Sequence, residues 1–116
     1  MAGGRTMKLP GGDKAYVDVR KLRDYCLSES HPRGRHKARV FAAALGLKAE
    51  DAGELRRVLL AAARDAEALP LEKEQYGQRY VVECAMDGPG GPGVIRSFWI
   101  VRPDEGFPRL LTCYVV

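Results

Sequence analysis

The spacing of apolar residues changes once along this chain, between residues 69 and 80, from the period of a helix to the period of a strand. Before the change, apolar side chains recur three and four residues apart, and after it they alternate. Helices followed by strands are typical of an α+β domain, in which the helices cover one face of an antiparallel sheet. The 116 residues are enough for one such domain.

Three helices are expected in the first part of the chain. The first begins after Asp18, a candidate N-cap, and ends near residue 27. The second covers about residues 35–45, and Gly46 is a natural stop because glycine adopts the left-handed conformation of a helix C-terminus. The third covers about residues 49–68 and ends before Pro70. A short extended piece at residues 15–17 precedes the first helix.

Three strands are expected in the second part, at residues 80–86, 94–101 and 110–116. The Gly- and Pro-rich run at residues 87–93 and the segment 103–108 are typical turns. Short connections predict an antiparallel meander of three strands, with room for a fourth short strand. The Gly-rich residues 1–12 are interpreted as a flexible tail, which leaves residues 13–116 as the single α+β domain.

The sequence HPRGRHKAR at residues 31–39 contains both histidines and four Lys or Arg residues, and no acid. The wider window of residues 20–39 has seven Lys or Arg against two acids, an excess larger than the net charge of +4 of the whole chain. A concentrated positive segment with groups that titrate near neutral pH favours contact with a polyanion.

No metal-ligand spacing, cofactor motif or phosphate-binding glycine loop is present, so no metal or cofactor is expected. The remaining chemistry is acid–base cleavage of a phosphodiester, in which RNA supplies its own 2′-hydroxyl nucleophile. His31 is the leading acid–base candidate, and Lys37 could hold the phosphate. Arg96 lies in an apolar strand and is either functional or paired with Glu83. The other candidate catalytic residues are two strand hydroxyls, Thr112 and Tyr114.

A second group of residues could contact the substrate: Arg33, Arg35, Arg39, Arg79 and Trp99. The first three arginines are more often part of a solvated basic face, whereas Arg79 lies between two tyrosines, Tyr76 and Tyr80, at the start of a strand. The tryptophan is more often a core residue than a base-stacking platform. His36 is expected on the solvated side of its helix. The three cysteines, the absence of a signal peptide and the absence of a membrane-spanning run indicate a reduced, cytoplasmic protein.

The signature LP…KLRDYCLSESHPRGRHKARVFAAALGL…YGQRYVV…IRSFWIVRP…PRLLTCYVV, between Leu9 and Val116, resembles a family of small bacterial domains of unknown function. That family is similar, more distantly, to the metal-independent toxin ribonucleases of the barnase, EndoU, colicin-D and RelE-like superfamily. The resemblance implies catalytic roles for His31, Lys37, Arg96 and Thr112 or Tyr114. It also implies a small antitoxin or immunity protein as partner.

The function expected from these residues is a metal-independent endoribonuclease of toxin type, with RNA as substrate and no membrane association. Two alternatives stay open. The same basic segment could serve a non-catalytic module that docks an acidic partner protein or a nucleic acid, or it could be only the solvated surface of an auxiliary protein. The three differ in one respect: a nuclease needs its candidate residues to meet around one phosphate.

Overall fold

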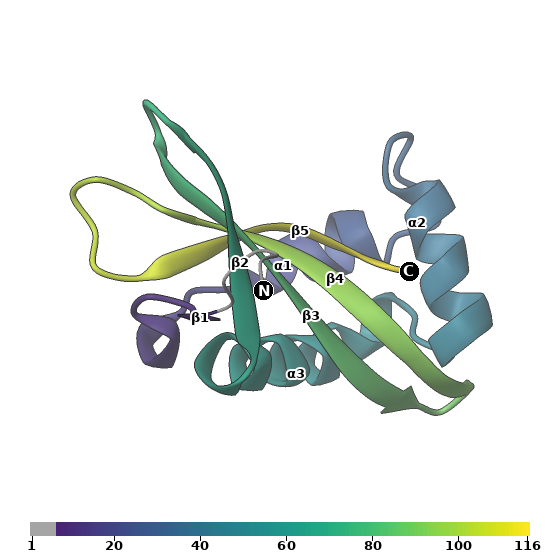
Figure 1. Cartoon of the computed structure of the whole chain (residues 1–116). Helices are drawn as coiled ribbons and strands as arrows, with labels where there is room; N and C mark the ends of the chain where they lie inside the picture. The colour runs from purple at the N-terminus through teal and green to yellow at the C-terminus, as the bar shows by residue number, and fades with distance from the viewer. Residues whose placement is uncertain (1–6) are drawn as a thin grey trace.

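The computed structural model describes residues 7–116, and in this part of the chain three helices accompany a five-stranded antiparallel sheet (Figure 1). The strands follow one another in the order β1-β2-β3-β4-β5. Their bounds are β1 Met7–Lys8, β2 Glu67–Glu74, β3 Gly77–Gly88, β4 Gly91–Val101 and β5 Pro108–Val115. The α+β class is therefore confirmed, but the prediction of three or four strands was wrong.

The missed strands are β1 and β2. They explain why the third helix was predicted too long and why the N-terminal tail was predicted to extend to residue 12. The third helix, α3 (Ala52–Asp65), stops before Glu67, where β2 begins. Pro70 lies inside β2, a position tolerated because β1 pairs only with Glu67 and Ala68 and leaves that edge of β2 free at Pro70. Met7 and Lys8 form β1, so residues 7–12 belong to the fold rather than to a flexible tail; the rest of that predicted tail, residues 1–6, lies outside the described residues.

The expected helix signals are confirmed. The first helix, α1 (Val19–Lys21), continues as a π-helical turn at Leu22–Cys26, and the Asp18 carboxylate accepts the backbone N–H of Arg20 at 3.0 Å. The second, α2 (Arg35–Val40), continues as a π-helical turn at Phe41–Leu45. Gly46 ends it with a φ of 72°. One turn of 3-10 helix at Ala49–Asp51 leads into α3.

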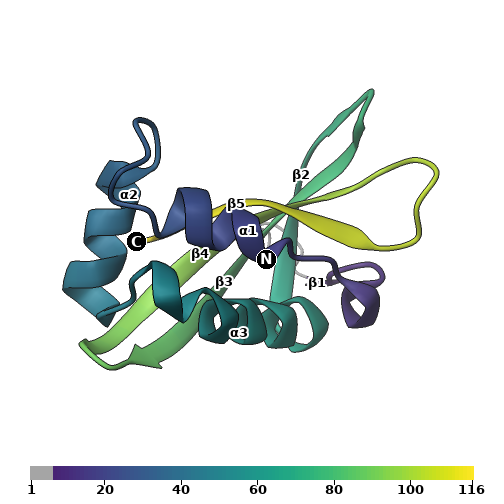
Figure 2. The same cartoon turned by 180° about the vertical axis from the view of Figure 1, so that it is seen from behind.

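The helices cover one face of the sheet and leave the other without a helix (Figures 1 and 2). In β4, Ile95, Ser97 and Trp99 are fully buried under the helices, while Arg96 and Phe98 lie on the opposite face and are half-buried. The polar atoms of the core are paired, because Trp99 Nε1 donates to Ser97 Oγ at 2.9 Å and Ser97 Oγ donates to the Val82 carbonyl at 2.8 Å. We call the helix-free side the open face.

The expected extended piece at residues 15–17 is not a strand of the sheet. Tyr16 instead forms an isolated parallel bridge with Arg109. Its N–H donates to the Pro108 carbonyl at 2.9 Å, and its carbonyl accepts from Leu110 N–H at 3.0 Å. The start of the first helix is therefore fastened to the outer edge of β5.

The predicted Gly/Pro turn is the tip of the β3–β4 hairpin, and it packs against the end of the second helix. Gly90 N–H donates to the Leu45 carbonyl at 2.9 Å. A Cβ at Gly88 would lie 2.1 Å from the same carbonyl oxygen. Glycine is needed here because the backbones of the hairpin and of the second helix approach closely. This contact, and not only the turn, accounts for the glycines of the segment.

We expect Gly88→Ala to lower the free energy of unfolding by about 1–3 kcal/mol, since the added methyl group forces the hairpin away from the second helix. Chemical denaturation at equilibrium measures the change. Gly53→Ala is the matched control because nothing lies within 4 Å of its Cβ position in α3. It should stabilise the protein by about 0.5–1 kcal/mol. Equal effects of the two substitutions would contradict the close approach.

Candidate functional site

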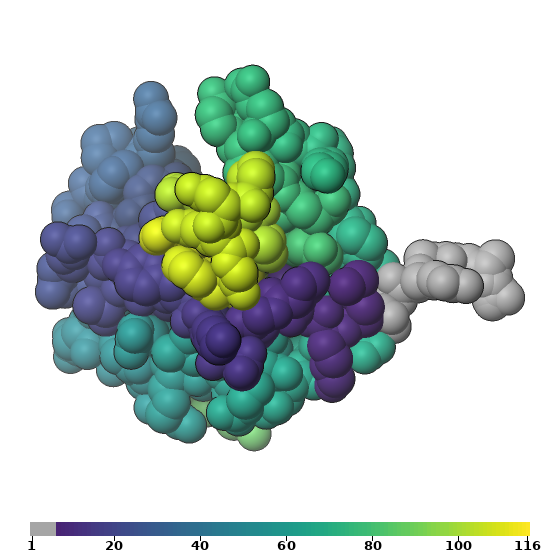
Figure 3. Space-filling view, turned by 90° about the vertical axis from the view of Figure 1, so that its left-hand side faces the viewer, coloured from purple at the N-terminus to yellow at the C-terminus, as the bar shows by residue number. Residues whose placement is uncertain are grey.

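The candidate site is a hollow at the outer edge of β5, bounded by the first helix, the loop at residues 28–34 and α2. It has a volume of about 700 Å³. We call it the His31 hollow. In the space-filling view, the blue segment near residue 30 and the β2–β3 hairpin rise on either side of the yellow β4–β5 loop (Figure 3). The hollow is lined by Asp18, Arg20, Lys21, Asp24, Tyr25, His31, Lys37, Leu111 and Thr112.

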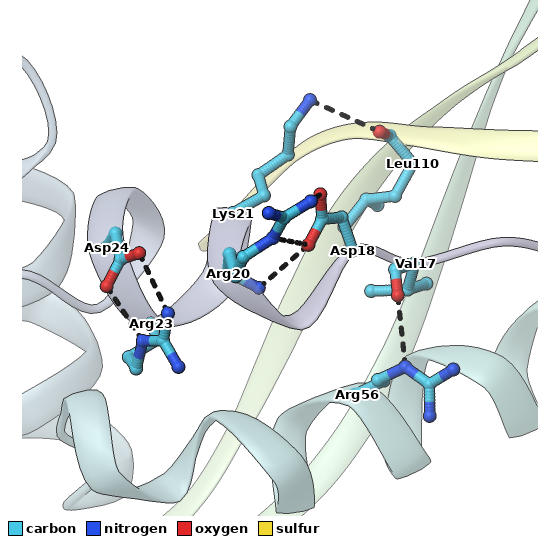
Figure 4. Close-up of polar contacts among 8 residues, drawn as sticks. All are labelled: Val17, Asp18, Arg20, Lys21, Arg23, Asp24, Arg56 and Leu110. Atoms are coloured by element: carbon cyan, nitrogen blue, oxygen red, sulfur yellow. Dashed lines mark hydrogen bonds and ion pairs between the residues drawn. The ribbon is translucent and has the colours of Figure 1, made fainter.

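Several cations of the first helix are already paired inside the protein (Figure 4). Arg20 binds the Asp18 carboxylate through two hydrogen bonds of 3.1 Å, and this contact lowers the pKa of Asp18. Arg23 binds Asp24 in the same way at 2.8 and 3.1 Å. Lys21 Nζ donates to the carbonyl of Leu111 at 3.1 Å. The dense positive window of the sequence is therefore not one uniform patch on the surface.

His31 lies in the loop before α2, as predicted, and its ring is held on one side by the backbone. Its Nδ1 accepts the N–H groups of Arg33 at 3.0 Å and Gly34 at 3.1 Å. Tyr25 packs edge-on against the ring, with centroids 4.6 Å apart. Because Nδ1 is an acceptor, the neutral ring carries its proton on Nε2. His31 can thus offer an Nε2–H donor to a ligand in the hollow, whereas acting as a base would require giving up both backbone hydrogen bonds.

Lys37 connects the His31 hollow to the open face of the sheet. Its Nζ lies over the ring of Tyr114, 5.0 Å from the centroid. Within residues 7–116 no carboxylate forms a salt bridge with it, so its charge is available to an anion. His31 and Lys37, six residues apart in the sequence, line the same hollow.

Arg96 does not line this hollow. It faces Tyr114 in the register of β4 and β5, and its Nε binds Glu83 Oε2 at 2.6 Å. Hydrogen bonds to Glu83 and then to Tyr114 raise the pKa of Arg96. The pairing with Glu83 was the alternative interpretation of this residue, and both side chains stay partly exposed, at 39% and 47%. Arg96 contacts Tyr114, whose ring lies under the Lys37 ammonium, but it does not itself line the hollow.

Thr112 lines the His31 hollow, but its Oγ1 is buried. This hydroxyl lies at the Cys26 thiol and is one of the groups that lower the pKa of Cys26. Beneath it, Cys26 and Cys113 are buried side by side. The hydrogen bond from Cys113 is the largest cause that lowers the pKa of Cys26 to about 7, and the same pairing raises the pKa of Cys113 well above its ordinary value.

The remaining predicted substrate contacts do not line the His31 hollow. Arg33, Arg35 and Arg39 are exposed, and so is His36. Arg79 pairs with Glu74 at 3.2 Å and lines a different hollow, between the β2–β3 hairpin and the β4–β5 loop. Trp99 is fully buried, so its interpretation as a substrate contact was wrong. The core interpretation of Trp99 is confirmed.

Six of the lining residues were not among the predicted site residues, and Lys21 and Tyr25 are two of them. Both come from the first helix, and nothing in their spacing distinguishes them from an ordinary amphipathic face. The parallel bridge between Tyr16 and Arg109 brings that helix to β5, and this contact depends on the assembled sheet. The one sequence signal that included these two residues was the basic character of the window 20–39.

The chain belongs to a family described as a domain of unknown function (DUF6883), whose model matches residues 8–116. The family predicted from the signature motifs is therefore confirmed. No curated protein matches the sequence. Within residues 7–116, no helix is long and apolar enough to cross a membrane.

Proposed function

We propose that this family member is a metal-independent endoribonuclease of toxin type. One observation carries the proposal: His31, Lys37 and Thr112, from a loop, a helix and a distant strand, line the same hollow. The Lys37 ammonium and the Nε2–H of His31 are two donors suited to the oxygens of one phosphate. Tyr114, under Lys37, holds that charge at the border of the hollow.

In the proposed reaction the ribose 2′-oxygen attacks phosphorus and the bond from phosphorus to the 5′-oxygen breaks. The products carry a 2′,3′-cyclic phosphate and a 5′-hydroxyl. Lys37 and the Nε2–H of His31 stabilise the charge that develops on the phosphorane. Because Nδ1 of His31 is tied to the backbone, solvent accepts the 2′-proton and returns a proton to the 5′-oxygen. In our proposal this donor role replaces the acid–base role first expected for His31.

We expect the purified protein to cleave single-stranded RNA in the presence of EDTA and to leave 2′,3′-cyclic phosphate ends. His31→Asn should lower the rate about 100-fold, since it removes the Nε2 donor. Its side-chain oxygen can still accept the backbone N–H groups that Nδ1 holds, because Asn is a good acceptor at a helix N-terminus. Denaturing gels with end-labelled RNA measure the rate. His36→Asn, on the exposed side of α2, is the control.

The pH dependence of the rate and the integrity of the RNA distinguish the possible outcomes of this experiment. A rate that keeps rising with pH agrees with solvent as the proton acceptor, whereas a rate that levels off indicates a side-chain base. Intact RNA at high concentrations of the wild-type protein would reject the ribonuclease. That result would favour the second candidate, a non-catalytic module that docks an acidic protein or a nucleic acid. Two contacts support this second candidate: Arg96 is paired with Glu83, and Nδ1 of His31 accepts hydrogen bonds from the backbone. Neither group is then available for catalysis.

A toxin of this kind needs a neutralising partner in the same cytoplasm, and we propose a small acidic antitoxin or immunity protein. The support for it is the exposed arginine group of α2 and the loop before it, namely Arg33, Arg35 and Arg39. Within residues 7–116 these arginines take part in no salt bridge, so they offer a charged surface to a carboxylate-rich partner.

A further inference from the structure

The open face of the sheet carries a pair of aromatic rings beside the His31 hollow. Phe98 on β4 and Tyr114 on β5 have centroids 5.7 Å apart and planes inclined by 34°. Both side chains are half-buried, and no helix covers this side of the sheet. Phe98 faces Thr112 in the strand register, and Tyr114 faces Arg96. The ring pair is therefore contiguous with the residues of the proposed phosphate site.

The two rings have different surroundings. The face of Tyr114 is occupied by the Lys37 ammonium, 5.0 Å from its centroid. Phe98 instead borders a second hollow of about 610 Å³ on the open face. The apolar side chains of Leu69 and Val81 line this hollow, and the Glu83–Arg96 pair lies at its rim. Phe98 thus offers a flat apolar ring beside the hydrogen-bonding Glu83–Arg96 pair, and the Lys37 ammonium lies over the neighbouring Tyr114 ring.

We propose that this second hollow seats one unpaired base of RNA, stacked on Phe98, while Lys37 contacts the phosphate of the same strand. The inference rests on the proposed function, and it adds that the substrate is single-stranded. Stacking on an aromatic side chain needs an exposed base face, which a duplex does not offer. The Glu83 carboxylate and the Arg96 guanidinium could accept from and donate to the edge of the seated base.

The alternative occupant, an acidic protein, fits this surface less well. The one guanidinium that lines this hollow, that of Arg96, is already paired with Glu83, so it is not available to the carboxylates of an acidic partner. The positive charge lies at its border, over Tyr114, where a phosphate would follow the base. An apolar seat with a cation to one side matches a nucleotide, which joins an aromatic base to an anion.

The test uses Phe98→Leu, which keeps an apolar side chain but removes the aromatic face. The probe is a fluorescein-labelled 2′-O-methyl RNA, which has no free nucleophile and stays intact. Fluorescence anisotropy compares it with its duplex and with an abasic oligomer of the same backbone. We expect Phe98→Leu to raise the Kd for the single strand about fivefold or more and to leave the abasic Kd unchanged. Val94→Ala, on the same face of β4 but outside the hollow, should change neither.

Lys37→Ala separates this inference from the proposed function, because it should weaken the single strand and the abasic oligomer alike. Single-strand binding that depends on Lys37 but not on Phe98 would overturn the base seat and leave the ribonuclease proposal intact. A wild-type protein that binds the abasic oligomer or the duplex as tightly as the single strand would overturn it too. A wild-type protein that binds none of the probes would overturn both. Thermal unfolding of each variant confirms that the fold is kept.

Discussion

Lys37→Ala is expected to slow RNA cleavage by a factor of about 10²–10³, the effect of removing one donor that stabilises charge in a transition state. The structure gives the reason: within residues 7–116, Lys37 has no carboxylate partner, and its ammonium lies at the border of the His31 hollow. Single-turnover rates with saturating protein and end-labelled RNA measure the loss. Under these conditions the chemical step is observed rather than binding.

The matched control for this prediction is Arg39→Ala. Arg39 is an exposed cation on the same helix, but it does not line the hollow. Its loss should weaken binding slightly and leave the single-turnover rate close to that of the wild type. Lys37→Arg keeps the positive charge and should retain more activity than alanine. Equal losses for Lys37→Ala and Arg39→Ala would show that only the overall charge matters, which favours a docking module over an enzyme.

Trp99→Ala is expected to lower the free energy of unfolding by about 3–5 kcal/mol, the usual result of removing a large aromatic side chain from a core. Trp99 is 0% exposed, and its Nε1 bonds to Ser97, which itself bonds to β3 through the Val82 carbonyl. The substitution therefore leaves a cavity between the helices and the sheet and breaks a buried polar chain. Urea denaturation followed by circular dichroism measures the change.

A loss of this size is a large part of the stability of a small domain, so Trp99→Ala could prevent folding altogether. Trp99→Phe covers that case, because it keeps most of the buried ring and should lose clearly less stability than Trp99→Ala. Tyr76→Ala, at a position 66% exposed, should stay within about 0.5 kcal/mol of the wild type. If Trp99→Ala were as mild as Tyr76→Ala, the helix-covered face of the sheet would have been assigned wrongly, and Trp99 would again be available to a substrate.

Local signals predicted the parts of this fold that local interactions decide. Asp18 caps the first helix because a carboxylate can reach the N–H of Arg20 two residues away. Gly46 ends the second helix because only glycine adopts a positive φ without strain. Apolar alternation predicted β3, β4 and β5 in the same way. The strand β2 was missed because a single residue separates it from α3, and because it contains a proline and no β-branched residue.

The candidate site was predicted in part for a similar reason. His31 and Lys37 are six residues apart, so their meeting at one hollow needed only a loop followed by one turn of helix. Arg96 was ambiguous in the sequence, since a charged residue in an apolar strand is either paired or functional. The register of β3 and β4 places Arg96 directly opposite Glu83, and the two side chains form an ion pair. Phe98 was not recognised as a residue of the open face, because nothing in the alternation of β4 says which side the helices cover.

By itself, the sequence determined the α+β class, the three helices, the family and the segment that carries the concentrated charge. These depend on periodicity, capping and composition, which act over a few residues at a time. Only the tertiary structure decided which cations are neutralised by neighbours, which nitrogen of His31 faces a ligand and which side of the sheet stays open. These properties depend on contacts between residues far apart in the chain, such as Lys37 with Tyr114, and packing alone selects those partners.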